Sequence, residues 1–135
     1  MFDLCNRRYM DAVIQAGRKE NESLAMIQMI DRYKEDEKTF FIVDRGYETY
    51  NIFGHTEQKG MYYLIRVKDG GGGSMVSSFK LPDIDEFDCP VHFILTRKQT
   101  NAVKENPSLY KIMPKASPFD YLDLHENEFY PMKPR

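Results

Sequence analysis

The spacing of apolar residues in the first half of the chain predicts one helix and one strand with clear ends. Apolar side chains repeat every three to four residues between positions 24 and 30, after Asn21, whose side chain can cap a helix. Residues 39–43, Thr-Phe-Phe-Ile-Val, form an uninterrupted β-prone run, which is typical of a strand buried on both faces. We therefore expect an amphipathic helix, followed by a buried strand that ends at Asp44.

The segments around these two elements extend the pattern to a sheet. Short apolar segments on either side of the polar residues 6–8 predict two antiparallel strands joined by a turn. Thr49 can cap a second helix that closes at Gly60, and residues 61–68 alternate as a further strand does. This order of elements predicts an α/β fold, a mixed sheet with right-handed crossovers.

The second half of the chain has a different composition. All 7 prolines fall in residues 75–135, so we expect strands joined by irregular turns, with the clearest strand at 89–96. Between the halves, residues 70–74 read Gly-Gly-Gly-Gly-Ser, a flexible-linker composition that we interpret as the replacement of an excised loop. The expected organisation is a core over 1–69, a linker over 70–74 and a β-rich segment over 75–135.

Composition narrows the classes of function. The 135 residues carry 19 basic and 21 acidic side chains, a net charge of −2. The chain therefore lacks the overall basic excess that is typical of proteins that bind nucleic acid without regard to sequence. The 2 cysteines show no zinc-type spacing, which predicts a reducing, cytoplasmic location. No apolar run approaches the roughly 20 residues that span a bilayer, so no membrane role is expected.

Charge is nevertheless segregated locally after residue 96. An acidic window at 83–88 precedes a basic one, in which five side chains are candidate contacts to DNA phosphates. These candidates are Arg97, Lys98, Lys104, Lys111 and Lys115. The alternative interpretation is an ordinary solvated face.

Asp44 is the strongest candidate for chemistry. A carboxylate at the carboxyl end of a central strand lies where ligands bind in open α/β sheets, and its hard oxygens suit Mg²⁺. The alternative is that Asp44 is an ordinary turn or cap residue. A two-metal centre also requires several acids that converge on ions about 3.5–4 Å apart. The three histidines have no partners at metal-ligand spacing, so we interpret them as structural or surface residues.

Several motifs resemble those of a known enzyme family. Residues 43–48, Val-Asp-Arg-Gly-Tyr-Glu, together with the strands at 40–42 and 61–68, look like the middle of a bacterial transposase of the insertion-sequence-four type. Residues 2–12 resemble the segment just upstream in that family, and 97–118 resembles the region that follows in some members.

The resemblance implies a ribonuclease H-like fold, a DDE triad of acids that bind Mg²⁺ or Mn²⁺, and a β-rich insertion between the second and third acids. Asp44 falls on the second acid of the triad. The first acid would lie in an Asp-Gly-Ser or Asp-Gly-Thr strand upstream of this sequence. The third acid is the Glu of a motif that opens with Tyr and Arg. Tyr63 and Arg66 match this opening by chance, and Gly70 stands where the motif has its Glu. An incomplete ribonuclease H-like sheet is therefore expected, with one catalytic acid of three.

Two hypotheses about function follow. The chain is part of a metal-dependent DNA transposase that acts on transposon ends and is inactive alone, or it is a non-catalytic, transposase-derived module that binds DNA or protein. The incomplete sheet leaves an open edge, and such edges pair with other chains, so a homo-oligomer is expected.

Overall fold

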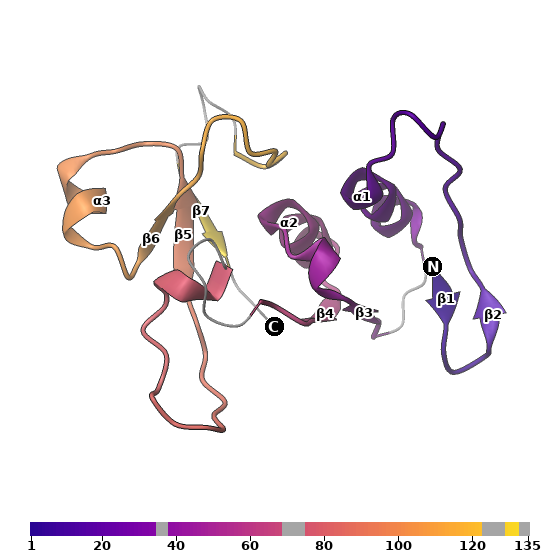
Figure 1. Cartoon of the computed structure of the whole chain (residues 1–135), viewed down its shortest axis with the longest axis horizontal. Helices are drawn as coiled ribbons and strands as arrows, with labels where there is room; N and C mark the ends of the chain where they lie inside the picture. Colours follow the sequence, from indigo (N-terminus) through magenta and orange to yellow (C-terminus); the bar gives the residue numbers. More distant parts are fainter. Residues whose placement is uncertain (35–37, 69–74, 123–128, 133–135) are drawn as a thin grey trace.

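The computed structural model describes residues 1–34, 38–68, 75–122 and 129–132, and its elements form a row (Figure 1). The N-terminal hairpin and α1 lie at one end, α2 with β3 and β4 in the middle, and a three-stranded sheet with α3 at the other end. The first half contains β1 (Phe2–Asp3), β2 (Arg8–Tyr9), α1 (Glu22–Arg32), β3 (Phe40–Val43), the short helix η1 (Arg45–Tyr47), α2 (Tyr50–Gln58) and β4 (Tyr62–Ile65). The second half contains η2 (Met75–Ser78), β5 (Phe93–Thr96), α3 (Asn101–Glu105), β6 (Tyr110–Ile112) and β7 (Phe129–Met132).

The two predicted helices of the first half are confirmed, with their caps. The Asn21 side chain accepts a hydrogen bond from the Leu24 backbone N–H at 2.9 Å, and the Thr49 hydroxyl accepts one from the Ile52 N–H at 3.3 Å. Each bond satisfies an N–H group that the first turn of a helix leaves without an intrahelical partner. After α2 the chain turns at Gly60 with a positive φ of 69°, a backbone conformation that glycine adopts without steric cost.

The strands of the first half form two separate small sheets, so the prediction of one mixed sheet is wrong. β1 pairs antiparallel with β2, as the apolar flanks of residues 6–8 predict, whereas β3 pairs parallel with β4. The hairpin stays apart because its strands are two residues long and exposed, which leaves little apolar surface to bury against β3.

The prediction that residues 40–43 are buried on both faces is also wrong. Phe41 is 6% exposed, but Phe40 and Ile42 are 63% and 60% exposed. Helix α2 covers one face only, where the ring of Phe53 stacks on Tyr63 with centroids 4.7 Å apart. Alternate side chains of β3 therefore point into the core and into solvent.

The second half is built on β5, the middle strand of a sheet with the order β6-β5-β7. β5 runs parallel to β6, with the five-residue helix α3 in the connection, and antiparallel to β7. The predicted strand at 89–96 is thus confirmed over its last four residues.

One hydrophobic core serves both halves. Ile30 of α1, Ile52 of α2 and Leu95 of β5 are at most 1% exposed and belong to the same cluster. Rings meet across the boundary as well, since Tyr50 and Phe93 lie 5.7 Å apart between centroids. The predicted linker at 70–74 falls outside the described residues, and the proposed domain boundaries stay predictions.

Candidate functional site

Asp44 lies where the sequence places it, directly after β3. Its carboxylate accepts a hydrogen bond from the Arg45 N–H at 2.7 Å and so caps the short helix η1, while its side chain remains 63% exposed. The residue is therefore a cap that also faces solvent at the carboxyl end of a parallel strand. The interpretation of Asp44 as a cap is thus confirmed, and its role as a metal ligand stays a prediction.

Arg66 is the partner of Asp44 across the parallel pair. β3 and β4 are in register, so the residues that follow the two strands lie side by side, and Arg66 Nη2 approaches Asp44 Oδ1 to 2.7 Å. The hydrogen bond from the Arg45 backbone lowers the pKa of Asp44 most. Desolvation opposes this effect, and the Arg66 guanidinium lowers the pKa further, so that it stays below its ordinary value. Asp44 is thus an ionised carboxylate at neutral pH.

Glu48 is a second acid in this region, and it already has two partners. One carboxylate oxygen accepts a hydrogen bond from the Lys68 N–H at 3.1 Å, and the other accepts one from the Met75 N–H at 2.9 Å. Glu48 therefore links the backbone of Lys68 to that of Met75, the described residues on either side of 69–74. Sequence reasoning alone does not identify Glu48, for which the position four residues after Asp44 is the available signal.

These acids border a pocket of about 710 Å³. Its charged lining comes from Asp44, Arg45, Glu48 and Lys68, and its apolar lining includes Tyr50, Met75, Met113 and Pro118. The pocket thus lies between the end of β3 and the segment that follows β6. Both halves of the chain contribute to the candidate site.

The described residues do not make a two-metal centre. Asp44 offers an exposed carboxylate to a divalent cation, although the Arg45 N–H and Arg66 both contact its Oδ1. Glu48 is half-buried, and each of its carboxylate oxygens accepts a backbone N–H. Nowhere in the part of the chain that the structure describes do three His, Cys, Asp or Glu side chains gather closely enough to hold a metal ion. One carboxylate with water as the remaining ligands binds Mg²⁺ weakly and cannot organise two ions.

The five basic candidates for DNA contact differ in their surroundings. The Arg97 guanidinium donates to the carbonyl oxygens of Pro114 at 2.6 Å and Ser117 at 2.8 Å, which fixes one wall of the pocket. Lys111 is 7% exposed, with its ammonium 4.5 Å from the centre of the Phe79 ring.

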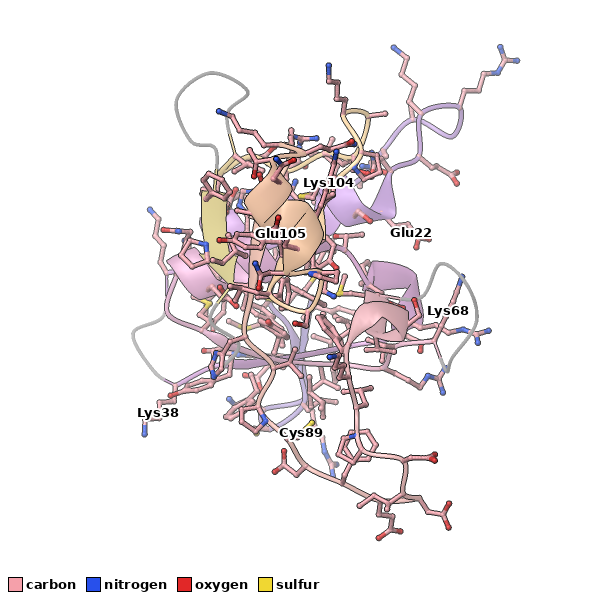
Figure 2. All side chains as sticks on the ribbon, turned by 90° about the vertical axis from the view of Figure 1, so that its left-hand side faces the viewer. Glu22, Lys38, Lys68, Cys89, Lys104 and Glu105 are labelled. Carbon is pink, nitrogen blue, oxygen red and sulfur yellow. The ribbon has the colours of Figure 1, made fainter. Side chains whose placement is uncertain are left out.

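The other three candidates lie nearer to solvent. Lys104 and Lys115 are exposed and Lys98 is half-buried. Figure 2 shows Lys104 on α3, apart from Lys68, which is one of the residues that line the pocket. Lys98 and Lys115 follow the parallel strands β5 and β6, and so share one edge of the sheet.

Comparison with known protein families gives a match over most of the chain. Residues 1–115 match the family described as transposase DDE domain. No curated protein and no solved structure matches the chain. Among the described residues no helix is long and apolar enough to cross a membrane.

Proposed function

Because the chain belongs to the transposase DDE domain family, we propose that it takes part in DNA transposition and supplies Asp44 as a metal-binding acid. The observation that carries the proposal is the position of Asp44. Its exposed carboxylate lies at the end of a parallel strand and borders a pocket with both acidic and basic lining. Such strand ends are where open α/β sheets bind their ligands.

We further propose that this chain does not cut DNA on its own. Two-metal phosphoryl transfer needs several acids that clamp both ions, and of the two described acids that line the pocket only Asp44 is exposed. Mg²⁺ or Mn²⁺ would act in a complete centre, where it would stabilise the attacking and leaving oxygens of the phosphodiester. In this account Asp44 holds a cation loosely and other acids complete the site.

Cleavage of supercoiled plasmid tests the proposal. The chain is incubated with Mg²⁺ or Mn²⁺, beside Asp44→Ala and a buffer control, and nicked and linear products are separated on a gel. We expect no cleavage above the control from either protein. Cleavage by the wild type that disappears in Asp44→Ala would show that this chain contains a complete centre and would overturn the proposed inactivity.

A second candidate function is a non-catalytic module that binds DNA or protein through the second half. Lys98 and Lys115 favour it, because they share the edge of the β5–β6 sheet and can hold phosphates without reading sequence. The effect of metal distinguishes the two functions. DNA binding that strengthens with Mg²⁺ and loses this effect in Asp44→Asn supports the transposase role, whereas binding indifferent to both supports the module.

Self-association and cytoplasmic location stay predictions. The parallel pair β3–β4 presents Phe40, Ile42 and Leu64 to solvent, each at least 60% exposed. An exposed apolar strand pair of this kind favours pairing with another chain. Light scattering over a range of concentrations tests this, and a strict monomer at high concentration would contradict it.

A further inference from the structure

His55 lies between two aspartates from distant parts of the chain. Its Nδ1 is 2.8 Å from Asp31 Oδ1 at the end of α1, and its Nε2 is 2.9 Å from Asp120 Oδ2 after β6. The hydroxyl of Tyr121 also reaches Nδ1, at 3.0 Å. The ring is 7% exposed, so these groups replace the water that would otherwise solvate it.

Asp120 and Tyr121 each have a fixed state of protonation over the range in which histidines titrate. Burial raises the pKa of Asp120, but hydrogen bonds from His55 and Asn51 outweigh burial and leave that pKa below its ordinary value. Burial, with a contribution from Asp31, raises the pKa of Tyr121 to about 12. Asp120 therefore accepts hydrogen bonds throughout this range, and Tyr121 keeps a proton that it can donate.

The surroundings of the ring come from three parts of the chain. Helix α1 contributes Asp31, and the Lys59 ammonium binds the backbone oxygen of that residue. Helix α2 also contributes Asn51, whose side-chain amide donates to Asp120 at 3.1 Å. The segment after β6 contributes Asp120 and Tyr121, the latter with its ring 4.8 Å from the imidazole between centroids.

Two hydrogen-bond arrangements fit this geometry. With a proton on each nitrogen, the ring donates from Nδ1 to Asp31 and from Nε2 to Asp120. With one proton, the ring still donates from Nε2 to Asp120, and Nδ1 becomes an acceptor for the Tyr121 hydroxyl. In the second arrangement Asp31 has lost its donor on His55, and solvent, to which its side chain is 47% exposed, replaces it.

We propose that His55 is a proton-operated junction between helix α1 and the segment that carries Asp120 and Tyr121. The imidazolium form links Asp31 to Asp120 through the ring. When Nδ1 releases its proton to solvent past Asp31, the link to α1 opens and the link to residues 120–121 remains. The junction requires neither metal nor DNA, so it stands apart from the proposed role of Asp44.

The junction also affects the pocket beside Asp44. Ser117 and Pro118 line that pocket and precede Asp120 by two to three residues. Because Asp120 remains bound to His55 in both forms, the pocket wall stays attached to α2 while the tie to α1 changes. The device therefore adjusts how α1 is held and leaves the pocket intact.

Nitrogen-resolved NMR of the histidine rings in the full chain tests the proposal, from about pH 5 to pH 9. We expect His55 to carry protons on both nitrogens at the acidic end and on Nε2 alone at the basic end. The carboxylate signal of Asp31 should change with the loss of the Nδ1 proton. A neutral ring with its proton on Nδ1, or a ring that never gains the second proton, would overturn the proposal.

Two variants give opposite expected shifts. Asp31→Asn removes the acceptor of the charged form, so at a given pH a smaller share of the rings should carry two protons than in the wild type. Tyr121→Phe removes the donor of the neutral form, so that share should be larger than in the wild type. The exposed His92 supplies a control, since His92→Gln should leave the signals of the His55 ring and of the Asp31 carboxylate unchanged over the whole pH range. Equal titration of the wild type, Asp31→Asn and Tyr121→Phe would contradict the proposed exchange of partners.

Discussion

Asp44 and Arg66 meet at the ends of two parallel strands, with the guanidinium Nη2 2.7 Å from the carboxylate Oδ1. Both side chains are well exposed, so the pair gains little from its Coulomb attraction. The pair matters for metal binding instead, because Arg66 contacts the carboxylate that a divalent cation would need. A cation at Asp44 has to displace or share this partner.

Arg66→Ala should raise the pKa of Asp44 without returning it to the ordinary value of 3.8. The reason is that the largest cause of the low pKa is the backbone bond from Arg45, which the substitution keeps. Because the folded-state pKa is depressed, Asp44 stabilises the fold above its unfolded pKa, and this contribution disappears as pH falls through the folded value. Carbon-detected NMR of the carboxylate measures the shift. Arg45→Ala is the matched control and should move the pKa less; an unchanged pKa in Arg66→Ala would contradict the pairing.

Asp44→Ala should leave the chain folded, with a melting temperature within about 4 °C of the wild type. The substitution removes a cap and an exposed ion pair, and it opens no cavity. Leu95→Ala is the comparison, because Leu95 is fully buried and its truncation costs about 2–5 kcal/mol. Thermal unfolding by circular dichroism measures both variants. A loss for Asp44→Ala as large as that for Leu95→Ala would show that Asp44 has a structural role.

The local signals in the sequence were sufficient for the two helices of the first half and for the place of Asp44 after a strand, but they did not predict α3. Asn21 and Thr49 form caps within their own first turns, so three or four neighbouring residues determine the outcome. The exposure of Phe40 could not be predicted in this way, because it depends on whether one or both faces of a sheet are covered. The sequence shows no partner for His55, because the two aspartates that it contacts lie 24 and 65 residues away and a single sequence does not reveal such contacts.

Gly54→Ala should destabilise the chain, although alanine favours helices over glycine by about 1 kcal/mol. A Cβ atom at this position of α2 would lie 3.0 Å from the Phe119 ring and 3.1 Å from the Tyr121 ring. Crowding of this kind in a packed interior typically costs about 1–3 kcal/mol. Denaturant unfolding measures the change, with Gly46→Ala as a control in open space. Partial recovery in the double variant Gly54→Ala with Phe119→Leu should follow; a stabilised Gly54→Ala would show that the rings yield freely.

Replacement of Lys98 and Lys115 by alanine should weaken DNA binding equally for all sequences. Each lysine that neutralises a phosphate contributes about one unit to the slope of log affinity against log salt, so the double variant should lose about two units. Fluorescence anisotropy with a labelled duplex at several salt concentrations measures this slope. Lys38→Ala is the control for the loss of a positive charge, because Lys38 lies away from Lys104 and Glu105 of α3 (Figure 2). Equal slopes for the wild type and the double variant would exclude these lysines as phosphate contacts.

The most direct measurement of the central claim, that Asp44 is a metal-binding acid, is paramagnetic broadening of backbone NMR signals by Mn²⁺. Mn²⁺ at a weak carboxylate site broadens nearby amides even when its occupancy is low. The account predicts selective broadening at residues 44–46, its disappearance in Asp44→Asn and its strengthening in Arg66→Ala, which frees the carboxylate. Broadening elsewhere in the chain, or at residues 44–46 but unchanged in Asp44→Asn, would contradict it.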